Sequence, residues 1–225
     1  MRTSSRVVTI IGVFTVALSA PLNAQVITSD PSLPVLYPPG YYANLAGVGP
    51  SFVGSGLTIV LANDEHRALS VDSRTPVGPD EVELFQSTFL AQVSVNGSPF
   101  QPSTGSGPVQ TVVHGKIGNT TGLFSTEMLS MSLSGSSPFG PFMIRESPTL
   151  ASTGQTSISD LGGGNYLITS FFDIFTELSV DGGATWIPAT GSVRMNLEQV
   201  PEPSSAALLV LGLLGSRIFL RRRSA

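Results

Sequence analysis

The sequence predicts an all-β protein whose body is a single antiparallel β-sandwich, similar in layout to a jelly roll. The chain has 225 residues with 24 Gly and 17 Pro, a composition rich in turn formers. No long stretch of its middle repeats apolar residues at the helical spacing of about 3.6 residues. Turn signals instead recur at intervals of about 8–15 residues, which is typical of sandwiches and jelly rolls.

The strand candidates follow one another along the middle of the chain. They cover residues 56–62, 83–95, 108–115, 123–133, 141–145, 155–159, 165–180, 184–188 and 192–200. Asn96-Gly97 predicts a tight hairpin turn after the second. Residues 123–133 alternate, but neither face is wholly apolar, which predicts a strand interrupted by a bulge. The Gly/Ser/Pro-rich stretches 98–108 and 134–142 are predicted to be loops.

Four regions follow from these patterns. Residues 1–24 are a predicted signal peptide, and residues 25–50 form a Pro-rich arm that is either irregular or packs as a leading strand. Residues 51–199 form the β-sandwich domain, and residues 200–225 form a sorting tail with a short hydrophobic helix. Length alone permits one domain or two small ones.

Charge is distributed unevenly along the chain. Residues 25–199 hold five basic and 14 acidic side chains, a net charge of −9, and the other basic residues lie near the two ends. An acidic body argues against nucleic acid as a partner, because phosphate binding requires clustered Lys and Arg. The chain has no Cys, which excludes a lipidated-cysteine anchor and Cys-based zinc sites.

The amino-terminal residues have the three parts of a secretory signal peptide. Arg2 and Arg6 precede the apolar run 7–18, and small residues lead to a predicted cleavage between Ala24 and Gln25. We therefore expect export through Sec-type machinery. The alternative is an uncleaved amino-terminal anchor.

The carboxyl-terminal tail combines a proline motif, an apolar run and basic residues. Pro201, Glu202 and Pro203 precede the apolar stretch 204–220, and Arg221, Arg222 and Arg223 follow it. As a helix the stretch would be about 26 Å long, which is shorter than the membrane's hydrocarbon thickness of about 30 Å. The arginines would lie on the cytoplasmic side of the inner membrane. An amphipathic helix of the domain is the alternative, but the stretch has no polar face.

This tail resembles the PEP-CTERM sorting signal of exported bacterial proteins. The resemblance covers about the last 25 residues and implies recognition by an exosortase, a membrane-embedded processing enzyme. It also implies an association with extracellular polysaccharide. The expected route runs from an inner-membrane-anchored precursor to the cell surface or the extracellular space. We therefore expect a surface or matrix-associated structural protein.

A second local pattern lies at residues 179–186. Ser179, Asp181, Gly183, Thr185 and Trp186 resemble the Asp-box of secreted β-proteins, a motif that is structural in that family. Asp181 is expected to accept hydrogen bonds from turn amides, and Gly183 permits a positive φ. We expect these residues to stabilise a hairpin; contact with a ligand is the alternative.

The sequence offers little for catalysis, so we expect no enzyme, no cofactor and no metal. His66 lies in the polar stretch 63–67, which is predicted to be a solvent-exposed turn; with Asp64 and Glu65 it forms the hydrolase or metal-site alternative. His114 lies in an apolar alternation and is predicted to lie on a strand. The acidic group 80–83 is predicted to be a solvated turn, with a Ca²⁺ site as its alternative.

Carbohydrate binding is the remaining alternative function. Tyr41 and Tyr42, in a Pro/Gly-rich context, are the aromatic pair that would present rings to a glycan.

Overall fold

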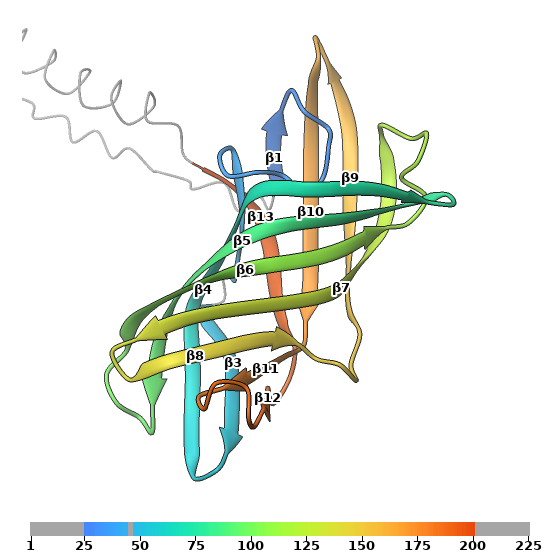
Figure 1. The fold of residues 1–225 in the computed structure, drawn as a ribbon. Coiled ribbons are helices and arrows are strands. Elements are labelled where there is room, and N and C mark those ends of the chain that lie inside the picture. Colours follow the sequence, from blue (N-terminus) through green and yellow to red (C-terminus); the bar gives the residue numbers. More distant parts are fainter. Residues whose placement is uncertain (1–24, 45–46, 201–225) are drawn as a thin grey trace, which may run out of the picture.

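The computed structural model describes residues 25–44 and 47–200, which form thirteen β-strands and no helix (Figure 1). The strands in chain order are β1 (Gln25–Thr28), β2 (Gly40–Ala43), β3 (Val48–Gly54), β4 (Leu57–Val77), β5 (Asp80–Val95), β6 (Gln101–Val113), β7 (Gly122–Ser137), β8 (Gly140–Glu146), β9 (Ser152–Gly162), β10 (Asn165–Ile174), β11 (Thr176–Ser179), β12 (Ile187–Pro188) and β13 (Val193–Gln199). The predicted signal peptide and the predicted carboxyl-terminal helix lie outside the described residues.

Eight of the strands close into one antiparallel barrel. The order is β2, β4, β5, β6, β7, β9, β10 and β13, and β13 pairs back with β2. The prediction of an all-β fold is confirmed. The predicted sandwich is not found, because the eight strands form a continuous ring with no break that would separate two sheets. Strand alternation is the same in a sandwich and in a barrel, so the pattern alone did not distinguish them.

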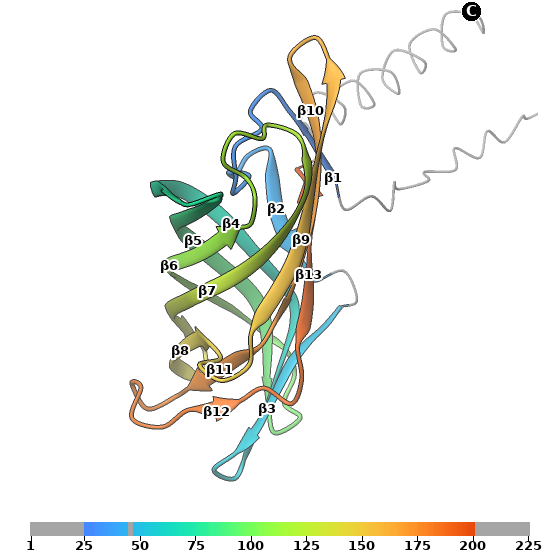
Figure 2. The same ribbon diagram turned by 90° about the vertical axis from the view of Figure 1, so that its right-hand side faces the viewer.

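The remaining strands extend the barrel at its two ends. At the end that we call the β12 end, β3 pairs with β4, β8 with β7, and β11 with both β8 and β12. A bridge between Phe52 and Ala189 joins β3 to the residue after β12. At the opposite end, β1 pairs with β10 (Figure 2). Strands β4 to β7 therefore run through both halves of the molecule.

Several predicted loops are strands in the structure. The arm 25–50 contains β1, β2 and the start of β3, and most of the predicted loop 98–108 belongs to β6. Gly107 explains this second case. A Cβ atom there would lie 2.0 Å from the Ser132 carbonyl oxygen, so glycine allows β6 and β7 to approach closely. The turn predicted at Asn96-Gly97 does join β5 to β6, with positive φ at both residues.

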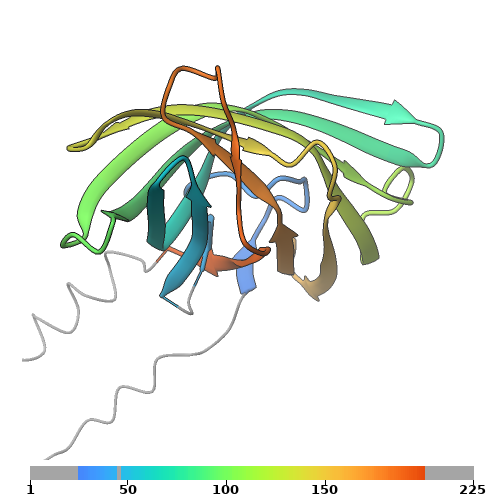
Figure 3. The same ribbon diagram turned by 90° about the horizontal axis from the view of Figure 1, so that it is seen from below.

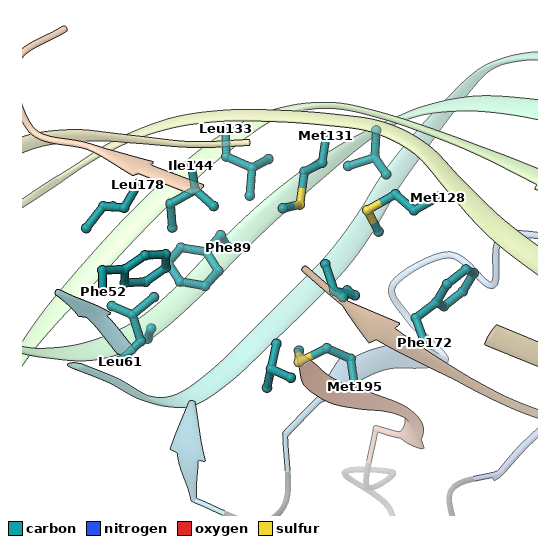
Figure 4. Close-up of a cluster of buried hydrophobic side chains, with 14 of the residues drawn as sticks. Phe52, Leu61, Phe89, Met128, Met131, Leu133, Ile144, Phe172, Leu178 and Met195 are labelled. Carbon is teal, nitrogen blue, oxygen red and sulfur yellow. The ribbon is translucent and has the colours of Figure 1, made fainter. Parts of the chain in front are cut away.

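An apolar cluster fills the β12 end and the middle of the barrel. Figure 4 shows Phe52 and Phe89 close together, with Leu133, Ile144 and Leu178 around them. Leu133 and Phe52 are completely buried. Strand β7 contributes to this core through its predicted bulge: Val109 faces Met131 whereas Thr111 faces Met128, so one extra residue of β7 is accommodated between them.

The opposite end of the barrel is closed by the chain between β1 and β2. Residues 29–39, which we call the covering segment, pass within the ring of strands when the barrel is viewed along its length (Figure 3). Leu33 and Val35 are buried in a second apolar cluster with residues such as Phe124 and Leu197. The Arg74 side chain donates from Nε to the Leu33 carbonyl oxygen at 2.7 Å. The segment is therefore packed and hydrogen-bonded onto the barrel.

Candidate functional site

A cavity of about 50 Å³ lies inside the barrel beneath the covering segment. Leu33 and Pro34 of that segment line it together with the apolar side chains of Phe85, Met128 and Phe172. Seven polar or ionisable side chains from six ring strands also line it, and we call them the polar belt. They are Tyr42, His66, Glu83, Ser87, Thr111, Thr126 and Thr156.

Glu83 is the most unusual member of the polar belt. Its side chain is 1% exposed. One carboxyl oxygen, Oε2, accepts a hydrogen bond from the Thr111 hydroxyl at 3.1 Å, and the other, Oε1, has no partner within the described residues. Burial raises the pKa of Glu83 to about 8, so its carboxyl group is largely protonated at neutral pH. A protonated carboxyl group can donate a hydrogen bond as well as accept one.

Thr126 is the second incomplete member of the belt. Its hydroxyl is buried and, like Glu83 Oε1, has no hydrogen-bond partner in residues 25–44 and 47–200. An unpaired buried polar atom costs about 1–3 kcal/mol, and native proteins hold few of them. The two residues that carry these atoms line one cavity from β5 and β7, and Thr111 of β6 also lines it.

Two members on the far side of the belt are joined through Ser170. Tyr42 donates from its hydroxyl to Ser170 Oγ at 2.9 Å, and Ser170 Oγ lies 2.7 Å from Thr156 Oγ1. Burial holds the pKa of Tyr42 above its ordinary value, so the phenol stays protonated. Among the described belt residues, the fully buried polar atoms without a hydrogen bond are therefore those of Glu83 and Thr126.

His66 lies inside β4, and the exposed turn predicted at residues 63–67 does not form. Alternation along the strand points Asp64 and His66 into the barrel, while Glu65 and Arg67 form an ion pair with each other. Burial lowers the pKa of His66 to about 4 and raises that of Asp64 to about 7. The ring of His66 packs against Phe89 at 5.1 Å between centroids. A neutral imidazole in an apolar contact is the expected state of this residue.

The other acidic and histidine candidates lie apart from the cavity. His114 Nδ1 is 2.9 Å from Asp80 Oδ2, and the Gly115 amide donates to Asp80 Oδ1 at 2.8 Å. These contacts, the Gly115 amide first, lower the pKa of Asp80. Within the described part of the chain, no three His, Asp or Glu side chains are grouped so that they could hold a metal ion.

The Asp-box-like residues form the turn between β11 and β12. Asp181 accepts hydrogen bonds from the Thr185 amide at 2.9 Å and the Thr185 hydroxyl at 2.6 Å, which lower its pKa to about 2. Ser179 accepts from the Gly183 amide, and Gly183 has a φ of +91°. Trp186 donates from its indole nitrogen to the Gly183 carbonyl oxygen, and its ring faces Arg145 at 4.1 Å.

The tyrosine pair proposed for glycan binding is divided between the two faces of β2. Tyr42 points into the cavity, whereas Tyr41 packs edge-on against Tyr37 at 6.5 Å. Arg67 lies over the Tyr37 ring at 4.4 Å. Tyr41, Tyr37 and Arg67 therefore form a partly exposed cluster that does not include Tyr42.

Sequence reasoning missed the polar belt. The signal was present in 83–95, where Glu83, Phe85, Ser87 and Phe89 occupy alternate positions and are all buried. A glutamate in register with an inward apolar row indicates a carboxyl group inside the barrel. The strand was recognised, but its inward face was not assigned.

The predicted sorting and cleavage residues are at the borders of the structure. Gln25 is the first residue of β1, and Val200, just after β13, donates its amide to the Pro39 carbonyl oxygen at 2.7 Å. Ala24, Pro201, Glu202, Pro203 and Arg221–Arg223 lie outside the described residues. Residues 25–44 and 47–200 contain no helix long and apolar enough to cross a membrane.

Comparison with known proteins identifies the tail. Residues 199–223 match the PEP-CTERM protein-sorting motif. No curated protein and no solved structure matches the chain. The chain therefore carries a PEP-CTERM protein-sorting motif that begins at the last residue of β13.

Proposed function

We propose that this protein is a non-catalytic surface or matrix-associated protein, exported as an inner-membrane-anchored precursor and processed by an exosortase-type enzyme near Pro201-Glu202-Pro203. The match of residues 199–223 to the PEP-CTERM protein-sorting motif carries this proposal. The motif is a sorting signal, so it assigns a destination to the barrel and leaves its role at that destination to other evidence.

The position of the motif relative to the barrel supports processing at this point. Gln199 pairs with Gly40, and the Val200 amide is the last barrel contact before the motif's prolines. Cleavage after Val200 would leave every strand of the barrel intact. Cleavage between Ala24 and Gln25 would likewise leave β1 complete.

Mass spectrometry of the protein from cells that contain the processing enzyme tests this proposal. We expect a mature form that begins near Gln25 and has lost the residues after about position 203. Replacing Pro201, Glu202 and Pro203 with alanine should leave the precursor uncut. The matched control replaces Thr153 with alanine, an exposed position of β9, and should be processed as usual. Full retention of residues 204–225 in the unmodified protein would refute processing.

Carbohydrate binding is a second candidate, supported by the outward cluster of Tyr41, Tyr37 and Arg67. Partly exposed aromatic rings beside a guanidinium group provide apolar faces and hydrogen-bond donors to one ligand. Tyr41→Ala should reduce retention on an extracellular polysaccharide in a pull-down assay, and Tyr166→Ala on β10 is the control. Equal retention of the two variants would remove this candidate.

A further inference from the structure

The cavity beneath the covering segment is not explained by sorting. Glu83 and Thr126 both line it, and Glu83 Oε1 and Thr126 Oγ1 are buried and lack partners within the described residues. A barrel of eight strands has room for interior side chains or for one small ligand. The volume of about 50 Å³ is about a third of that of a cavity that holds benzene, so it admits one or two water molecules or an organic molecule of about three non-hydrogen atoms.

The chemistry of the walls restricts the charge of a ligand. None of the described residues that line the cavity is Lys or Arg, so an anion would lie beside Glu83 without a counter-ion. A cation would have to be desolvated, and it would also have to remove the proton that Glu83 retains. An uncharged ligand avoids both costs.

The two unpaired atoms also specify a polar group on that ligand. A protonated Glu83 donates a hydrogen bond, and the Thr126 hydroxyl both donates and accepts. A hydroxyl or amide group can accept from Glu83 and exchange a hydrogen bond with Thr126. The apolar remainder would pack against Phe85, Met128 and Phe172, as in other small-molecule sites with few polar groups.

We propose that the barrel interior binds an uncharged molecule of about three non-hydrogen atoms that carries a hydroxyl or amide group, with Glu83 and Thr126 as its hydrogen-bonding partners. This inference is independent of the sorting proposal. Leu33 and Pro34 of the covering segment form one wall of the site, so entry requires that segment to move aside.

Methionine methyl groups give a direct measurement of binding. Met128 and Met195 line the cavity, whereas Met143 lies near Gly183 in the β11–β12 hairpin. The full chain with ¹³C-labelled methionine methyl groups is titrated with ethanol, propane and ethylammonium. We expect ethanol to shift the Met128 and Met195 signals saturably and to leave Met143 unchanged. Propane, which has the same shape, should bind about tenfold more weakly, since it pairs with neither polar atom.

Substitutions at Glu83 separate an uncharged ligand from a cationic one. Glu83→Gln keeps a donor in the same place and should retain ethanol binding within about threefold. Glu83→Leu removes the donor and should weaken binding about tenfold. Thr126→Val, which keeps the side-chain shape, gives the same test if the leucine variant does not fold. Glu127→Gln, on the neighbouring outward position of β7, should bind as the unmodified protein does.

Three results would overturn the proposal. The first is the absence of saturable shifts with ethanol, which would mean that the cavity holds water only. The second is undiminished binding by both Glu83→Leu and Thr126→Val. The third is tighter binding of ethylammonium that is lost in Glu83→Gln, which would identify a cation site instead.

Discussion

The two halves of the barrel share strands β4 to β7 but have different interiors. At the β12 end, most inward side chains are apolar and form one buried cluster that includes Phe52 and Leu133. At the covered end, the same strands carry Glu83, Thr111 and Thr126 into a cavity. The difference shows that one strand can supply a stabilising core along half its length and a polar interior along the other half.

The largest expected change in the free energy of unfolding comes from a substitution in the apolar cluster at the β12 end. Leu133→Ala removes a completely buried side chain and should lower the free energy of unfolding by about 3 kcal/mol, measured by chemical denaturation. Leu129→Ala on the same strand is the control, because Leu129 is 42% exposed and should change stability by less than about 0.5 kcal/mol. Equal effects at the two positions would contradict the described packing.

The pH dependence of the free energy of unfolding should show whether Glu83, at the covered end of the barrel, is protonated in the folded state. The pKa of Glu83 is raised from 4.5 in the unfolded chain to about 8, so the folded state holds its proton over that range. Stability should therefore fall as pH rises from about 5 to about 8, by up to about 1.4 kcal/mol per pH unit for this group. Arg74 and Lys116 oppose the shift, while Glu81 adds to it.

Denaturation at about pH 5.5 and pH 7.5 measures this slope, and Glu83→Gln should reduce it. Some slope should remain, because burial raises the pKa of Asp64 to about 7 and acts in the same direction. Glu127→Gln should keep the full slope. An unchanged slope in Glu83→Gln would mean that Glu83 is ionised inside the folded barrel.

The smallest expected change in the free energy of unfolding comes from substitutions at two threonines of the polar belt. Thr156→Val removes a hydrogen bond to Ser170 and should cost about 1 kcal/mol. Thr126→Val removes a hydroxyl without a partner in the described residues and should be neutral or stabilise the protein by up to about 1 kcal/mol. Thermal unfolding distinguishes these signs, and equal losses would show that Thr126 has a partner such as bound water.

Local features of the fold were predictable from the sequence because they depend on neighbouring residues. The Asn96-Gly97 turn and the interruption of 123–133 are examples, since turn chemistry and alternation of side chains are local properties. Ring closure was not predictable in this way. It depends on β13 pairing with β2, whose residues are about 155 positions apart, and no local pattern encodes that pairing.

The candidate site could not be predicted from local sequence patterns either. Glu83 was read as part of an acidic turn with Asp80, because consecutive charges usually lie in solvent. In the structure, Asp80 binds the Gly115 amide at the end of the hairpin, whereas Glu83 lies inside. Which face of a strand points inward is set by the whole barrel, so the cavity could not be located before the ring was known.

Ring closure also affects how copies of this protein behave when they are crowded together. Each of the eight ring strands has a bonded neighbour on both sides, so those strands offer little free backbone to which a second copy could add a strand. In a dense layer of molecules, the addition of a strand from a second copy would be restricted to the short strands outside the ring, such as β1 and β3, each of which pairs with one neighbouring strand in the described residues.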